Sequence, residues 1–169
     1  RQIPQAIQVT KAGAWPRING LTLEGKTVGI VGFGSIGRQL GRRLSGFNCR
    51  ILAYDPFPDL PFAFEFGIHL ATLEEVLHQS DIISLHLPLS SSTQSLVNES
   101  FLNQMKPGAM LINTARGDIV DETALLNALQ SGHLAGAGLD VFCQQPPDPS
   151  NPLLSLPNVL VTPHMGAHT

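Results

Sequence analysis

The sequence predicts an α/β fold in which a doubly wound parallel sheet lies between two layers of helices. Three observations indicate this architecture. Short β-rich runs alternate with helical patterns along the 169 residues, which is typical of βαβ units. The first strand, residues 26–32, is apolar almost throughout, as expected when helices cover both faces of a sheet. A glycine-rich turn, Gly32-Phe-Gly-Ser-Ile-Gly37, follows that strand directly.

Six strands are expected from the apolar, β-branched runs. They lie at residues 26–32, 50–55, 81–87, 108–114, 136–141 and 159–162. The third stops at Pro88, because a proline cannot continue a sheet ladder. Proline also predicts irregular stretches at residues 56–61 and at residues 146–152, after the second and the fifth strand.

Four helices are expected between these strands, at residues 36–47, 72–79, 98–105 and 121–131. The first places Ile36, Leu40 and Leu44 on one face. The other three begin at residues that can cap a helix: Thr72 in a capping box with Glu75, Asn98, and Asp121. Residues 1–20 are expected to form a helix and a hinge from another domain, and residues 21–169 a single domain.

Composition excludes several classes of function. The formal net charge of -3 leaves no basic footprint for nucleic acid or an anionic membrane surface. No apolar run reaches the roughly 18 residues that a membrane-spanning helix needs. Cys49 and Cys143 are too few for a disulfide framework and lack zinc-ligand spacing, so a reducing, cytoplasmic setting is expected.

The glycine-rich turn predicts a dinucleotide-binding loop of the Rossmann type. The pattern G-x-G-x-x-G is weak alone, but here it follows a predicted strand and opens a predicted helix. Gly32 permits the tight turn, Gly34 lets a pyrophosphate approach the backbone, and Gly37 lets the helix pack close to the strand. The N–H groups of Ser35 and Ile36 then face the phosphates at the helix N-terminus.

Asp55 ends the second strand, 18 residues after Gly37. A carboxylate there accepts hydrogen bonds from the ribose hydroxyls of NAD and repels the 2′-phosphate of NADP. No Lys or Arg lies between Arg50 and Lys106 to favour that phosphate. The sequence therefore predicts NAD as the cofactor.

Six motifs make the chain resemble the D-isomer-specific 2-hydroxyacid dehydrogenases, over nearly all 169 residues. They are Gly32-Phe-Gly-Ser-Ile-Gly37, Leu85-His-Leu-Pro-Leu89 with Thr93, Met105-Lys-Pro-Gly108, Ile112-Asn-Thr-Ala-Arg-Gly117, Gly138-Leu-Asp-Val-Phe142 and Thr162-Pro-His-Met-Gly166. The resemblance implies a D-2-hydroxyacid/2-oxoacid oxidoreductase, a missing substrate domain that forms the other wall of the active-site cleft, and a homodimer.

The resemblance also implies roles for individual residues. Arg116 matches the arginine that binds the substrate carboxylate, which suits its planar, permanently charged guanidinium. His164 matches the acid/base that exchanges a proton with the substrate oxygen. Further positions match the NAD cleft of the family: Leu87, Pro88, Thr93, Thr114, Ala115, Arg116, Asp140 and His164.

Gln145 departs from the family pattern. The family has a glutamate before a proline at this position, which bonds to the histidine and stabilises its charged form. A neutral Gln145 can orient His164 but cannot stabilise that charge. Three consequences stay open: carbonyl reduction requires more acidic solution, a carboxylate such as Asp148 substitutes, or no proton moves, as in the formate dehydrogenases of this superfamily, which carry Gln here.

Two alternatives to a hydroxyacid dehydrogenase therefore remain. One is formate dehydrogenase-like hydride transfer with a Gln145–His164 pair. The other is a binding module that senses NAD(H), which a weakened catalytic triad favours and intact Arg116 and His164 oppose. No metal is expected, because His168 could join His164 on an ion but no third ligand is evident.

Overall fold

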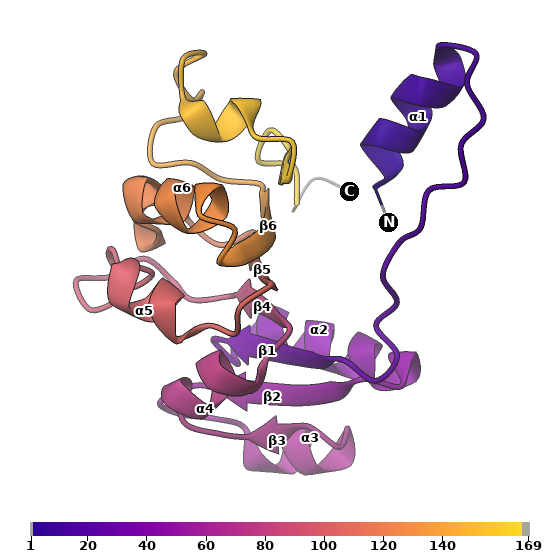
Figure 1. Cartoon of the computed structure of the whole chain (residues 1–169). Coiled ribbons are helices and arrows are strands. Elements are labelled where there is room, and N and C mark those ends of the chain that lie inside the picture. The colour runs from indigo at the N-terminus through magenta and orange to yellow at the C-terminus, as the bar shows by residue number, and fades with distance from the viewer. Residues whose placement is uncertain (1, 167–169) are drawn as a thin grey trace.

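The computed structural model describes residues 2–166, which form a parallel sheet with strand order β3-β2-β1-β4-β5-β6-β7 (Figure 1). All its neighbouring strands pair in parallel. The strands are β1 (Thr27–Val31), β2 (Arg50–Tyr54), β3 (His69–Leu70), β4 (Ile82–Leu85), β5 (Ala109–Asn113), β6 (Leu134–Leu139) and β7 (Val159–Val161). The order reverses between β1 and β4, as in a doubly wound sheet.

The described part has six α-helices, of which α1 precedes the sheet and the others connect its strands. They are α1 (Ile3–Lys11), α2 (Ser35–Leu44), α3 (Leu60–Glu65), α4 (Leu73–Gln79), α5 (Glu99–Gln104) and α6 (Glu122–Gln130), with 3₁₀ turns η1 (Ser45–Phe47), η2 (Gly117–Ile119) and η3 (Pro152–Ser155). The predicted caps at Thr72, Asn98 and Asp121 are confirmed, and Thr72 forms the full capping box with Glu75.

Two apolar cores confirm the predicted three layers. The larger lies between the sheet and α4, α5 and α6, where Val76, Leu102 and Leu125 are buried. The smaller lies on the opposite face, where Ile30 and Leu44 join α2 to β1. Figure 1 shows α4, α5 and α6 along one side of the sheet and α2 behind it.

The stretch after Asp55 is more regular than predicted. It contains α3 and the two-residue strand β3, so the described sheet has seven strands rather than six. Asp59 caps α3, and Pro61 lies in its first turn, where a proline displaces no helical hydrogen bond. β3 was not predicted because two residues are too few to show a strand pattern.

The predicted buried face of the first helix is wrong at Ile36, which is 65% exposed. The buried positions of α2 are Gly37, Gly41 and Leu44. α2 approaches the sheet so closely that glycines fill its contact face. A Cβ on Gly41, for example, would lie 3.5 Å from Ile30 Cδ1 of β1 and 2.6 Å from Ile68 Cδ1, just before β3.

The first helix stands apart from the rest of the domain (Figure 1). It has no buried residue, and a long extended segment joins it to β1. Gln5 Nε2 donates a hydrogen bond to the Pro157 carbonyl oxygen at 3.2 Å. The predicted helix in residues 1–20 is confirmed, and its role as a hinge stays a prediction. Among the described helices, none is long and apolar enough to cross a membrane.

Candidate active site

Six strands of the described sheet end in one line. Val31 of β1 is in register with Tyr54 of β2 and Leu85 of β4. The line continues through Asn113 of β5 to Leu139 of β6 and Val161 of β7. The loops that follow these residues carry the predicted site residues, so all of them lie at the carboxyl edge of the sheet. This is where open α/β sheets bind their ligands.

The glycine loop has the geometry that its sequence predicts. Gly32 has a φ of +96°, and a Cβ there would lie 2.6 Å from the carbonyl oxygen of His86. A Cβ on Gly37 would overlap the Gly32 carbonyl oxygen, so this glycine lets α2 start against the strand. A Cβ on Gly34 would meet no atom within 4 Å. The loop is therefore open at Gly34, at the exposed N-terminus of α2, as a pyrophosphate-binding loop requires.

Asp55 is held beside this loop. Its Oδ2 accepts a hydrogen bond from the Phe33 N–H at 2.7 Å, and its Oδ1 accepts one from the Phe57 N–H at 2.8 Å. The half-buried carboxylate is thus fixed between the tip of β2 and the turn after β1. An open phosphate-binding turn beside a fixed carboxylate fits a dinucleotide whose adenosine ribose carries no 2′-phosphate.

Arg38 is a basic residue that contacts the loop after Asp55 and is absent from the predicted set. No basic residue lies between Arg50 and Lys106 in the sequence, but α2 brings Arg38 into an ion pair with Asp59 of the β2–α3 loop. The guanidinium carbon also lies 5.7 Å from the centre of the Phe62 ring. The place of Arg38 directly after Gly37, in the first turns of α2, is the signal in the sequence that points to it.

The loop after β4 contains three predicted cleft residues. Leu87 is half-buried and Pro88 is exposed. Thr93 closes the loop: its hydroxyl donates to the Pro88 carbonyl oxygen at 2.6 Å and accepts from the Ser90 N–H at 2.8 Å. The threonine hydroxyl is therefore engaged within its own loop.

His86, just before this loop, bonds to Ser84: its Nε2 lies 2.9 Å from the Ser84 hydroxyl oxygen. Burial lowers the pKa of His86 from 6.5 to about 4. The ring is therefore neutral at physiological pH.

Arg116 is presented by a tight turn after β5. Asn113, which is buried, accepts from the Ala115 N–H at 3.0 Å and donates to the Arg116 carbonyl oxygen at 2.9 Å. The Arg116 guanidinium donates to the Ala115 carbonyl oxygen at 2.6 Å. Thr114 and Arg116 are exposed, and Ala115 is buried between them. Asn113 was not predicted as a site residue, although its place at the strand end within the motif marks it.

Asp140 anchors the loop after β7. Its carboxylate accepts from the Thr162 hydroxyl at 2.5 Å and from the N–H groups of Met165 and Gly166 at 2.9 and 2.8 Å. Burial alone would raise the pKa of Asp140, but these hydrogen bonds and the charge of His164 outweigh it, so the pKa is lowered. Asp140 is thus an ionised residue whose oxygens hold the loop that carries His164.

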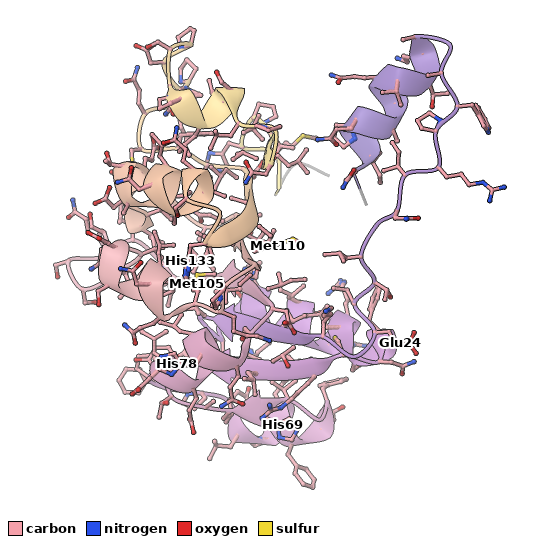
Figure 2. The ribbon with its side chains drawn as sticks, viewed as in Figure 1. Glu24, His69, His78, Met105, Met110 and His133 are labelled. Carbon is pink, nitrogen blue, oxygen red and sulfur yellow. The ribbon has the colours of Figure 1, made fainter. Side chains whose placement is uncertain are left out.

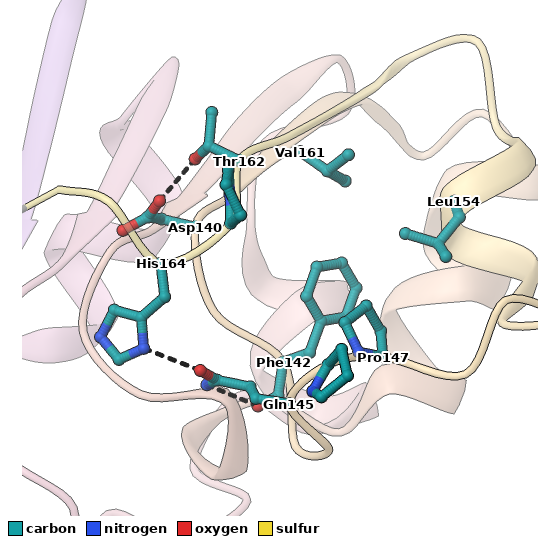
Figure 3. Close-up of a pocket in the computed structure, with 10 residues that line it drawn as sticks. Asp140, Phe142, Gln145, Pro147, Leu154, Val161, Thr162 and His164 are labelled. Carbon is teal, nitrogen blue, oxygen red and sulfur yellow. Dashed lines mark hydrogen bonds between the residues drawn. The ribbon is translucent and has the colours of Figure 1, made fainter.

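Gln145 and His164 form the pair that the sequence predicts (Figure 3). His164 Nδ1 lies 2.7 Å from Gln145 Oε1, and Gln145 Nε2 donates to the Phe142 carbonyl oxygen at 3.0 Å. Because the amide nitrogen is occupied, its oxygen faces the ring, which places the proton of the neutral imidazole on Nδ1 and leaves Nε2 as a base. The His164 backbone has a φ of +51°, and its N–H donates to the Asp140 carbonyl oxygen at 2.8 Å.

A cavity of about 400 Å³ lies behind this pair. Phe142, Pro147, Leu154 and Val161 give it an apolar lining, and Gln145 and His164 lie at its rim (Figure 3). Neither the glycine loop nor Arg116 lines it. The cavity is therefore a feature of the His164 half of the edge, separate from the dinucleotide loop.

The other histidines lie away from this chemistry. His69 and His78 are exposed on the lower part of the domain, and His133 Nε2 bonds to the Leu102 carbonyl oxygen at 2.9 Å (Figure 2). His168 lies outside the described residues. Within residues 2–166, no group of three His, Cys, Asp or Glu side chains is placed to hold a metal ion. Asp148 accepts two hydrogen bonds from Ser150.

Known proteins resemble this chain along its whole length. The family model "D-isomer specific 2-hydroxyacid dehydrogenase, NAD binding domain" matches residues 1–166. D-3-phosphoglycerate dehydrogenase of Archaeoglobus fulgidus is 42% identical over 171 residues, covering 100% of this chain and 32% of that protein.

Two solved structures are also similar. The pyruvate reductase of Chlamydomonas reinhardtii matches with a TM-score of 0.92 and 38% sequence identity. D-lactate dehydrogenase with NAD⁺ from Lactobacillus jensenii matches with a TM-score of 0.88 and 33% sequence identity. Both matches cover 100% of this chain, and 56% and 55% of those chains. The chain thus spans about a third of the curated relative and about half of the solved chains.

Proposed function

Because the chain belongs to the NAD-binding domain family of the D-isomer specific 2-hydroxyacid dehydrogenases, we propose that it holds the cofactor and the proton-transferring group of an NAD-dependent oxidoreductase. The proposed reaction interconverts a D-2-hydroxyacid and a 2-oxoacid. When bound, NAD(H) supplies or accepts the hydride. The observation that carries the proposal is the line of strand ends, which brings the glycine loop, Arg116 and His164 to one edge.

The first half of the edge is the proposed cofactor site. Gly32, Gly34 and Gly37 shape the turn, and the N–H groups of Ser35 and Ile36 at the N-terminus of α2 bind the pyrophosphate. Asp55 accepts hydrogen bonds from the adenosine ribose. Leu87, Pro88, Thr93, Thr114, Ala115 and Asp140 line the rest of the proposed cleft.

The second half is the proposed catalytic site. Arg116 binds the substrate carboxylate through the donors that its bond to Ala115 leaves available. His164 Nε2 takes the hydroxyl proton in oxidation and returns it to the carbonyl oxygen in reduction. Gln145 holds His164 Nδ1 and fixes the ring orientation. Since the relatives are longer than this chain, we propose that a second domain supplies the other wall of the cleft and that residues 1–20 form the hinge to it.

Gln145 favours a second candidate, hydride transfer from formate. That oxidation releases carbon dioxide and requires no proton transfer by His164, so a neutral partner for the histidine suffices. An NAD(H)-sensing role is the third candidate, in which the edge binds the dinucleotide without turnover.

We also propose a homodimer in a cytoplasmic, reducing setting. The α1 helix and the extended segment after it expose Ile3, Ile7 and Trp15, a set of apolar side chains that a second copy of the chain would cover. Cys49 and Cys143 are both free thiols, which suits a reducing compartment.

The test is NADH oxidation by the complete protein from pH 5 to 9 with glyoxylate, hydroxypyruvate and pyruvate, together with NAD⁺ reduction by formate or D-3-phosphoglycerate. Turnover of a 2-oxoacid or a hydroxyacid is the expected result. It should fall roughly 10²–10³-fold in Arg116→Gln, the loss typical of one stabilising donor. It should persist in the control Arg43→Gln, which changes an arginine that bonds to Gln39 on α2.

Two other outcomes would contradict this proposal. Turnover of formate alone would establish the second candidate. No turnover with NADH still bound would establish the sensing role.

A further inference from the structure

A chain of contacts connects Asp55 at the end of β2 with four further residues: Phe33, Phe62, Arg38 and Asp59. The Asp55 carboxylate bonds to the Phe33 N–H, and the Phe33 ring packs edge-on against Phe62 with centroids 6.0 Å apart. Arg38 lies over the Phe62 ring and pairs with Asp59. Asp59 in turn accepts from the Phe62 N–H at 3.1 Å. The contacts place the Arg38 guanidinium beside the loop that presents Asp55.

In NADP-binding sheets of this type, an arginine near the ribose accommodates the 2′-phosphate. In this chain the Arg38 guanidinium is already committed. The Asp59 carboxylate neutralises the charge of the guanidinium and accepts a hydrogen bond from it. The Phe62 ring lies against one face of the guanidinium. The side chains of Arg38 and Asp59 are each 34% exposed, so the pair is accessible from solvent.

We propose that Asp59 is a second determinant of cofactor choice, which acts by holding Arg38 in an ion pair and so denies a 2′-phosphate its binding partner. The inference rests on the proposed binding of the adenosine ribose at Asp55. Asp55 disfavours the 2′-phosphate by charge repulsion. Asp59 disfavours the 2′-phosphate by keeping the Arg38 guanidinium in an ion pair. Release of Arg38 gives the site a charged donor for dinucleotides that bear a 2′-phosphate.

Asp59→Asn tests the proposal cleanly. Asparagine caps a helix as well as aspartate does, so the start of α3 is retained, while the charge that holds Arg38 is lost. An ion pair that is partly open to solvent contributes little to stability, and the variant should fold. Titrating the protein with NADH and with NADPH, and following nicotinamide fluorescence, gives the two dissociation constants without turnover.

The expected result is a dissociation constant for NADPH that falls at least about tenfold, the gain typical of one hydrogen bond to a charged group, while that for NADH changes less than about threefold. Asp59→Asn combined with Arg38→Gln should lose this gain. The matched control Glu65→Gln removes a negative charge from the last turn of α3 and should leave both constants near those of the parent.

Three results would overturn the inference: unchanged NADPH binding in Asp59→Asn, an equal gain in Glu65→Gln, or a gain that survives Arg38→Gln. Asp55→Asn separates it from the proposed function. If Asp55→Asn leaves NADH binding unchanged, the proposed ribose site is wrong. If Asp55→Asn weakens NADH binding and Asp59→Asn does nothing, only the role of Asp59 is wrong.

Discussion

The two halves of the carboxyl edge are built differently. In the β1–β2 half, backbone groups form the site: glycines clear the space, and the carboxylate of Asp55 is fixed by the N–H groups of Phe33 and Phe57. In the β5–β7 half, side chains form it. Asp140 holds the loop of His164, and Gln145 holds the imidazole itself.

The difference has a physical reason. A dinucleotide phosphate needs several donors on a rigid turn, which a helix N-terminus supplies without any charged side chain. Proton transfer needs one titratable group in one orientation, so neighbouring side chains must fix it. Substitutions in the first half should therefore change binding or folding, and those in the second half should change turnover and its pH dependence.

The largest expected effect lies in the second half. His164→Asn removes the proposed acid/base and should lower kcat roughly 10²–10⁴-fold, the usual contribution of such a group. His69→Asn, on exposed β3, is the matched control and should leave kcat unchanged. Steady-state kinetics with the preferred 2-oxoacid provide the measurement. An active His164→Asn would show that the pair in Figure 3 does not move the proton.

His86, at the end of β4 between the two halves, and Asp140 make the stability of the folded chain depend on pH in two separate windows. The pKa of His86 is about 4 in the folded chain, against the ordinary 6.5 in the unfolded chain. As the pH falls below 6.5, the unfolded chain binds a proton that the folded chain excludes, so stability is lost down to about pH 4. The full loss is about 3 kcal/mol.

The lowered pKa of Asp140 acts in a separate, lower window, because its stabilisation is lost only as the pH falls below 3.8. Urea unfolding between pH 7 and 4 should therefore show a steep loss of stability that is much reduced in His86→Gln. It should persist in His78→Gln, which changes an exposed histidine. Equal slopes in all three proteins would mean that His86 is not held neutral.

Substitutions at two glycines of the β1–β2 half should separate effects on folding from effects on NADH binding. Gly37→Ala forces a methyl group against the Gly32 carbonyl oxygen and should cost about 1–3 kcal/mol of unfolding free energy. Gly34→Ala adds the same methyl group to open space at an ordinary φ of -73°, so it should leave stability nearly unchanged. It should weaken NADH binding, because the pyrophosphate must approach that atom. Urea unfolding and NADH titration of both variants distinguish these effects, and a destabilised Gly34→Ala with normal NADH binding would contradict the assignment.

Local signals explain which parts of the fold and site were predictable. The glycine loop follows from backbone requirements that lie within six residues, and the capped helices start at the side chains that cap them. The Gln145–His164 pair was anticipated because both residues occupy recognisable motifs. Each of these depends on short stretches of sequence.

Other features depend on packing between distant segments. The Arg38–Asp59 ion pair exists only because the fold brings Arg38 of α2 to Asp59, the residue that caps α3. Ile36 is exposed because Gly37, Gly41 and Leu44 form the contact face of α2, and Ile36 lies outside it. The hydrogen bonds of Asp140 likewise join the end of β6 to the loop after β7, and no local pattern in the sequence predicts that contact.

The measurement that tests the account most directly is the pH profile of 2-oxoacid reduction in the parent protein and in Gln145→Glu. A carboxylate beside His164 Nδ1 stabilises the protonated ring, so the protonated acid persists to higher pH. The profile of Gln145→Glu should shift upward by about one pH unit or more. Gln144→Glu, which adds the same charge at the neighbouring exposed position, should shift it less. An unmoved profile in Gln145→Glu, or an equal shift in both variants, would contradict the assignment of proton transfer to the Gln145–His164 pair.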